Sequence, residues 1–170
     1  FSPIEDSKLP ENICGLLLGG GYPENYAREL SCNDSMRQSI ARAIQENMPC
    51  LAECGGFLYL HDAITDIDGE EWAMVSVVHA TAAYQGKLQP RFGYITLEDG
   101  QTGMQIRGHE FHYYDSTDYG QEWTARKPLS SRHWSCMHKQ GNLLAGFPHL
   151  YYASNPGFAT EWVQRCRQWR

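Results

Sequence analysis

Residues 49–60, PCLAECGGFLYL, set the architecture: a short apolar strand meets a glutamate, a cysteine and two glycines before an apolar helix-like stretch. Residues 13–21, ICGLLLGGG, come earlier and are typical of a strand buried on both faces that ends in a glycine loop. Between the two stretches, Asn33 or Asp34 can cap a helix. Strand, helix and strand within about 40 residues predict a parallel β-α-β unit.

The second half of the chain is richer in strand patterns. Residues 74–83 are apolar and β-branched, and residues 91–98 face residues 105–107 across a hairpin-type Asp-Gly turn. Asn155 then caps a last amphipathic helix, whose apolar stripe consists of Phe158, Trp162, Cys166 and Trp169. The sequence therefore predicts an α/β fold with a mainly parallel central sheet, flanked by helices, and an antiparallel portion in the second half.

Composition limits the function classes. The chain has 170 residues, 42% of them hydrophobic and 20% charged, which suits one globular domain over residues 1–170. The net charge is −6, so a nucleic-acid backbone binder is not expected. No apolar run reaches membrane-span length, and no signal pattern opens the chain. The first residue is not Met, which indicates a piece of a longer protein. Six cysteines without a C-x-x-C pair predict reduced thiols in a cytoplasmic protein.

Cys54 is the candidate nucleophile. A reactive cysteine needs an exposed sulfur, a thiolate form and donors for the oxyanion it creates, and a sharp strand-to-helix turn supplies all three. Gly55 and Gly56 remove side chains that would crowd such a turn. The competing interpretation is a buried structural cysteine before a flexible glycine pair. The motif alone supports the catalytic and the structural interpretation about equally.

A glycine loop and a histidine complete the candidate site. The loop that contains Gly20 and Gly21 ends the neighbouring parallel strand, so its backbone N–H groups should lie beside Cys54 and hold an oxyanion. A nucleotide loop is the weaker interpretation, because no G-x-G-x-x-G or G-K-[ST] pattern follows. Of seven histidines, His149 is best placed as the base, because it lies between a short apolar strand and the final helix.

A second histidine motif, Gly108-His109-Glu110-Phe111-His112-Tyr113, looks like a metal site at first sight. Its spacing is not H-E-x-x-H, and no third ligand is obvious. We therefore expect no metal in this chain.

Several motifs in the same order resemble the glutamine amidotransferase domains of the cobyrinic and cobyric acid synthase family, and most closely the a,c-diamide synthase type. The motifs are Phe1-Ser2-Pro3 with Leu9-Pro10 as an entry segment, the glycine loop LGGGYPE of residues 18–24, the AECGG of residues 52–56 and the GHEFHY of residues 108–113. The resemblance covers nearly the whole chain and implies a class I glutamine amidotransferase-like fold.

The resemblance also implies a function. Such domains hydrolyse glutamine to glutamate and ammonia and pass the ammonia to a preceding, N-terminal synthetase domain, which is absent here. That domain uses ATP and Mg²⁺ to activate carboxylates of a corrin ring, whereas the amidotransferase domain itself needs no cofactor. Carried over to this chain, Cys54 attacks the amide, His149 is base and then acid, and the N–H groups of Gly55 and of Gly20 or Gly21 hold the oxyanion.

The chain departs from the family pattern after His149. The family pattern has a second histidine two residues after the catalytic one, and this chain has Tyr151 there. Triad amidotransferases place a glutamate at that position, which this branch is expected to lack. Glu53 and Glu110 are the candidates for orienting His149 instead. Alternatives to the a,c-diamide type are a cobyric acid synthase domain, a nickel-tetrapyrrole amidotransferase domain, or a catalytically silent module that only binds a partner. No nucleic acid or membrane is expected among the partners.

Overall fold

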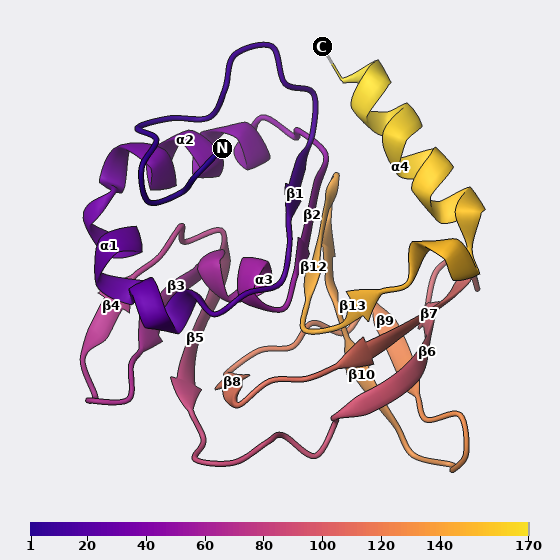
Figure 1. The fold of residues 1–170 in the computed structure, drawn as a ribbon. Helices are drawn as coiled ribbons and strands as arrows, with labels where there is room; N and C mark the ends of the chain where they lie inside the picture. Colours follow the sequence, from indigo (N-terminus) through magenta and orange to yellow (C-terminus); the bar gives the residue numbers. More distant parts are fainter. Residues whose placement is uncertain (170) are drawn as a thin grey trace.

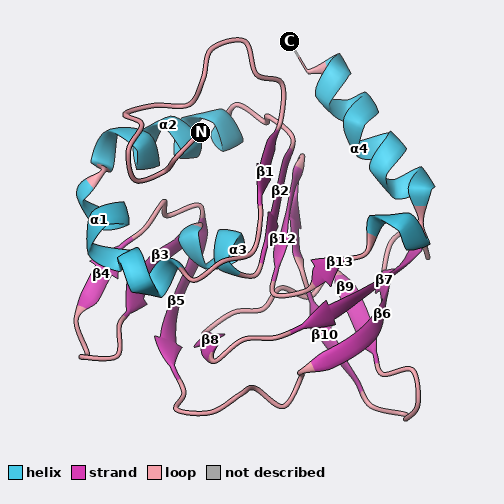
Figure 2. Cartoon of the chain, in the orientation of Figure 1, coloured by secondary structure: helices cyan, strands magenta, loops and turns pink. Residues whose placement is uncertain are grey.

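The structure is a computed structural model that describes residues 1–169, and its strands form three sheets (Figures 1 and 2). The parallel sheet has the order β1 (Leu16–Leu18), β2 (Cys50–Glu53), β12 (Leu143–Gly146) and β11 (His138–Gln140), with β11 antiparallel. The antiparallel sheet has the order β10 (His133–Cys136), β9 (Trp123–Arg126), β6 (Gly93–Asp99), β7 (Gln105–Glu110) and β13 (His149–Leu150). The small mixed sheet has the order β4 (Glu71–Ala73), β3 (His61–Thr65), β5 (Val78–Tyr84) and β8 (Tyr114–Ser116).

Helices lie on both sides of the parallel sheet, as Figure 1 shows. They are η1 (Pro23–Tyr26), α1 (Ala27–Cys32), α2 (Asp34–Gln45), α3 (Gly55–Tyr59), η2 (Tyr152–Ser154) and α4 (Pro156–Gln168). The predicted caps are confirmed, because the Asn33 side chain accepts a hydrogen bond from Met36 N at 3.3 Å and the Asn155 side chain accepts one from Phe158 N at 3.2 Å. None of the helices within residues 1–169 combines the length and the apolar character needed to cross a membrane.

The predicted α/β fold with a mainly parallel sheet is confirmed. Strand β1 pairs in parallel with β2 and the helices α1 and α2 connect them, while β6 and β7 form the predicted antiparallel hairpin. The antiparallel portion is a separate sheet rather than an extension of the parallel one. One detail is wrong: β1 is not buried on both faces, since Leu17 is 53% exposed. The reason is that β1 is an edge strand, whereas β2 lies inside the sheet and is buried throughout.

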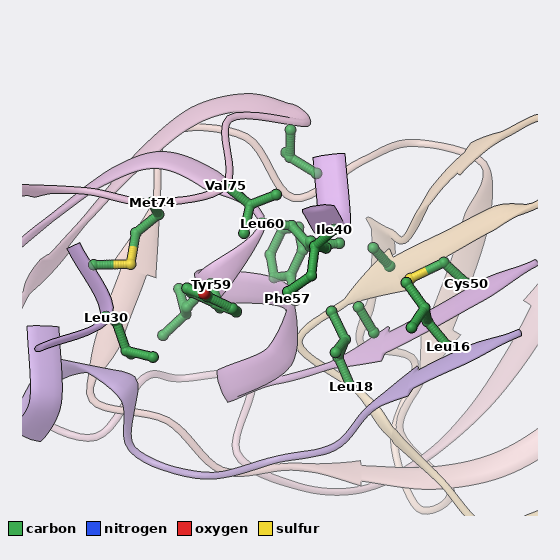
Figure 3. Packing of buried hydrophobic residues seen from close by; sticks show 14 of the residues in the cluster. Leu16, Leu18, Leu30, Ile40, Cys50, Phe57, Tyr59, Leu60, Met74 and Val75 are labelled. Carbon is green, nitrogen blue, oxygen red and sulfur yellow. The ribbon is translucent and has the colours of Figure 1, made fainter. Parts of the chain in front are cut away.

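The main hydrophobic core fills the space between the helices and the parallel sheet (Figure 3). Ile40 of α2 and Phe57 of α3 are both 0% exposed and belong to the same buried cluster as Leu16 and Cys50 of the sheet. Packing of this kind holds α3 against the carboxyl ends of β1 and β2, where the candidate nucleophile lies.

We expect Ile40→Ala to lower the free energy of unfolding by about 2–5 kcal/mol, because the change removes buried methyl groups and leaves a cavity. Urea unfolding followed by circular dichroism measures this loss. The matched control is Ile67→Ala, at a side chain that is 74% exposed, which should change stability by about 0.5 kcal/mol or less. Equal losses at the two positions would contradict this account of the core.

Candidate functional site

Cys54 lies at the sharp turn between β2 and α3, with a backbone φ of 48° and ψ of −105°. A positive φ is strained for a residue with a side chain, and such strain persists only where the surroundings enforce it. Here Cys54 N donates to Gly146 O at 2.8 Å, and Cys54 O accepts from Leu58 N at 2.9 Å. The turn is therefore fixed from both sides, by β12 and by α3.

The glycines around this turn are required by close packing. A Cβ atom on Gly55 would lie 2.5 Å from Gly21 O, and one on Gly56 would lie 2.2 Å from Leu18 O. Gly56 N also donates to Gly19 O at 2.9 Å, which ties the glycine loop to the start of α3. Larger residues at either position would push the loop away from Cys54.

The same loop reaches His149. A Cβ atom on Gly20 would lie 2.3 Å from Cε1 of the His149 ring, so only glycine lets the loop pass so close to the imidazole. The N–H groups of Gly20 and Gly21 have no acceptor within residues 1–169, and they remain available to a ligand. The structure thus brings the predicted residues Cys54, Gly20, Gly21, Gly55 and His149 together around one glycine loop.

The Cys54 thiol is protonated in this resting structure. Burial is the main cause that raises its pKa, to about 12, and the carboxylates of Glu24, Glu110 and Glu53 raise it further. The Gly55 N–H acts in the opposite direction but is outweighed. The thiol donates a weak hydrogen bond to the Phe111 carbonyl, with a sulfur–oxygen distance of 3.8 Å. A thiolate at this position therefore requires a base.

His149 has the properties of such a base. It lies on β13, and its ring stacks on the ring of His109 with a centroid distance of 4.8 Å. Burial is the main cause that lowers the pKa of His149, and the neighbouring imidazoles of His109 and His112 lower it further, while Glu110 acts in the opposite direction. The imidazole is therefore neutral at neutral pH and can accept a proton.

Glu53 is the carboxylate next to His149. Its Oε2 lies 3.8 Å from Nδ1 of His149, and its Oε1 accepts a hydrogen bond from the Tyr152 hydroxyl. Burial raises the pKa of Glu53, while the bonds from Tyr152 and from the Leu150 backbone lower it. The separation from His149 exceeds hydrogen-bond length, but such contacts are often long in ligand-free sites and shorten when substrate binds.

Glu110, the other predicted orienting residue, contacts different partners. Its carboxylate lies 3.3 Å from Nε2 of His112 and 3.6 Å from Nε of Arg91, and it accepts a hydrogen bond from Nε1 of Trp134 at 3.1 Å. The His112 ring stacks on Phe147 at 3.7 Å, so this buried cluster supports the segment that leads to His149. Glu110 does not contact the imidazole, and its charge raises the pKa of both Cys54 and His149 from a distance.

The two histidines of the GHEFHY motif lie in different surroundings. His109 is exposed and stacks on His149, whereas His112 is buried against Phe147. No cluster of three metal-binding side chains occurs within the described 169 residues.

Sequence reasoning missed two contributors, Tyr152 and the Phe111 carbonyl. Tyr152 reaches Glu53 across 99 positions of sequence, and no local pattern signals such a contact. The Phe111 carbonyl is a backbone group, which a side-chain motif does not indicate. The one available signal was the burial of Glu53 before Cys54, since a buried carboxylate needs partners.

Comparison with known proteins gives consistent matches. Residues 1–157 match the family of CobB/CobQ-like glutamine amidotransferase domains. A cobyrinate a,c-diamide synthase of Caldanaerobacter subterraneus is 37% identical over 98% of this chain, and one of Fusobacterium nucleatum is 39% identical over 95%. This chain spans only 38% and 37% of the lengths of those two relatives.

A solved structure supports the fold. A crystal structure described as a glutamine amidotransferase superposes with a TM-score of 0.63, covering 92% of this chain and 80% of that one at 17% identity. The family match covers most of the chain, and the sequence relatives are aligned along nearly all of it. The chain therefore belongs to the CobB/CobQ-like glutamine amidotransferase domains, a family of enzymes.

Proposed function

We propose that this chain is the glutaminase part of a cobyrinate a,c-diamide synthase. In this proposal it releases ammonia from glutamine for amidation of two carboxylates on a corrin ring. The observation that carries the proposal is the strained Cys54 turn, which packs against a glycine loop with unused N–H groups and a neutral histidine. The names of the curated relatives support the choice of acceptor.

The reaction begins with transfer of the Cys54 proton to His149. The thiolate attacks the side-chain amide carbon of glutamine, and the oxygen that becomes negative accepts hydrogen bonds from the N–H groups of Gly55 and of Gly20 or Gly21. His149 then returns the proton to the leaving nitrogen, which departs as ammonia and leaves a thioester on Cys54. A water molecule, activated by His149, attacks the thioester and releases glutamate.

The rest of the reaction belongs to a synthetase region outside this chain. Because the chain spans less than two fifths of its relatives, most of each relative lies beyond the matched part. We assign ATP and Mg²⁺ to that region, where they activate the acceptor carboxylates, and no cofactor to residues 1–170. We also place the whole enzyme in the cytoplasm.

The proposal is tested by covalent labelling. A glutamine analogue carrying a diazoketone should alkylate Cys54 alone, giving one adduct by intact mass and one modified peptide, and glutamine should protect against it. The built-in control is Cys32, an exposed thiol that a non-specific reagent would modify first. Labelling of Cys32, or of the buried Cys50, in place of Cys54 would refute the assignment.

We further expect Glu53→Gln to lower kcat about 10–100-fold, by analogy with the loss of the carboxylate partner of a metal-binding histidine. The amide keeps the shape of the side chain but cannot stabilise the imidazolium that forms on His149. The acid limb of the pH profile should therefore move to lower pH. Tyr152→Phe, which leaves the carboxylate in place but removes its hydroxyl partner, should have a smaller effect. An unchanged acid limb in Glu53→Gln would show that Glu53 has only a structural role.

A further inference from the structure

A row of side chains crosses the exposed face of the antiparallel sheet. The strand register pairs His133 with Arg126, Arg126 with Thr96, and Thr96 with Arg107. Tyr151, the residue that follows β13, donates its N–H to Arg107 O at 2.8 Å and extends the row beyond β7. Residues directly opposite each other in an antiparallel sheet point to the same face, so these side chains lie side by side.

The two arginines of this row have no acidic partner. Arg37, Arg91 and Arg165 each form an ion pair with a carboxylate, whereas Arg107 and Arg126 form none with any residue from 1 to 169. The acidic residue in the next row is Glu98, and its carboxylate accepts a hydrogen bond from Gln105 at 2.9 Å. Other exposed arginines, such as Arg28 and Arg167, also form no ion pair with residues 1–169, so Arg107 and Arg126 differ from them by sharing one row on a sheet face in a chain of net charge −6.

The row borders a groove that adjoins the candidate active site. The groove has a volume of about 700 Å³, and its lining includes Arg107, His109, Tyr94 and Tyr151. The two tyrosines are 80% and 61% exposed. The register pairs Tyr94 with His109 and His109 with His149, so the wall of the groove continues directly to the catalytic base proposed above.

We propose that this groove receives an acidic surface of the synthetase region, with Arg107 and Arg126 as its charged anchors and Tyr94 and Tyr151 as its apolar ones. The inference rests on the proposed function and identifies the surface through which the two parts of the enzyme meet. Tyrosine and arginine are the residues that most often dominate binding at protein interfaces. Complementary charge on the partner would fix the orientation of the two parts.

Position and spacing favour a protein partner over a small anion. Arg126 on β9 and Arg107 on β7 are separated by strand β6, a distance of about 10 Å, which suits two separate carboxylates. The curated relatives, of which this chain spans 38% and 37%, have enough additional chain to supply such a surface. Contact at this groove would also place the synthetase region beside His149, to which the wall of the groove leads.

The test uses the full-length enzyme and compares two nitrogen sources, glutamine and ammonium chloride. In the double variant Arg107→Glu and Arg126→Glu, glutamine-dependent diamide formation should fall about tenfold or more, while ammonium-dependent formation should stay within about twofold, because charge reversal opposes docking. The matched control is Arg28→Glu with Arg167→Glu, which makes the same charge change at exposed positions on α1 and α4. This control should resemble the wild type with both nitrogen sources.

Each other outcome would overturn the inference. Unchanged glutamine-dependent formation in the double variant would show that the groove does not dock the synthetase region. A loss with both nitrogen sources, together with a raised KM for the corrin acid, would show that the groove binds the ring carboxylates instead. A Cys54→Ser enzyme run in parallel separates this question from the proposed function. If that enzyme kept glutamine-dependent formation, the glutaminase proposal itself would be wrong.

Discussion

Replacement of Cys54 by serine is expected to abolish glutamine hydrolysis, with a loss of about 10⁴-fold or more, the scale seen when a covalent nucleophile is removed. The serine hydroxyl is slightly smaller than the thiol and should keep the backbone of the turn, but it is a far weaker nucleophile in this buried position. Release of glutamate, measured with a coupled dehydrogenase assay, reports the loss. The circular dichroism spectrum should not change.

Two controls separate chemistry from folding. Cys32→Ser changes an exposed cysteine far from the turn and should leave glutamate release unchanged. Cys50→Ser changes a fully buried cysteine on β2 and should reduce stability more than turnover. If Cys50→Ser removed turnover while Cys54→Ser did not, the nucleophile would be wrongly assigned.

The protonated resting state of Cys54 has a consequence for reactivity. Its pKa is raised to about 12 by burial and by the surrounding carboxylates, so a simple alkylating agent such as iodoacetamide should react with it slowly. The glutamine analogue should react much faster, because its bound polar groups bring the sulfur, His149 and the glycine N–H groups into the reactive arrangement. Selectivity for the analogue therefore comes from the whole site.

The elements that sequence could predict are those governed by local rules. The Cys54 turn follows from a short apolar strand and two glycines, and the caps at Asn33 and Asn155 follow from side chains that accept backbone N–H groups. Parallel strands end at the same edge of a sheet, so the parallel pairing of β1 with β2 places the loop that contains Gly20 beside Cys54. Strong local conformational preferences and a simple β-α-β topology were therefore sufficient to predict the Cys54 turn, the helix caps and the position of the glycine loop.

The partners of His149 depended on long-range contacts that sequence does not encode locally. Glu53 and Glu110 were equivalent candidates in the sequence, and the fold distinguishes them by giving Glu110 its own partners in Arg91, His112 and Trp134. Tyr151, at the position where triad amidotransferases have a glutamate, is 61% exposed and does not replace that carboxylate. The separate antiparallel sheet was also beyond prediction, because strand patterns fix pairing but not where one sheet ends.

Replacement of His149 by asparagine is the second large effect that we expect, a fall in kcat of about 10²–10⁴-fold. Asparagine retains a polar side chain beside Gly20 but can neither accept the Cys54 proton nor return it to the leaving ammonia. Steady-state glutamate release over a range of pH measures the effect. The protein should still fold, because His149 is partly exposed and lies on a short edge strand.

The pH profile assigns the loss to His149 itself. Burial, and next the neighbouring imidazoles of His109 and His112, lower the pKa of His149 below its ordinary value of 6.5, while Glu110 acts in the opposite direction. The base stays neutral as the pH falls through that value, and wild-type activity should decline only at lower pH. His109→Asn removes a neighbouring imidazole that lowers the pKa of His149, so the acid limb of this variant should move to higher pH with only a modest loss of rate. His79→Asn, at a histidine that pairs with Asp62 away from the site, should leave both the rate and the pH profile unchanged.

A fall in kcat of about 10²-fold or more in His109→Asn, with His149→Asn near wild type, would mean that His109, the other ring of the stacked pair, is the base.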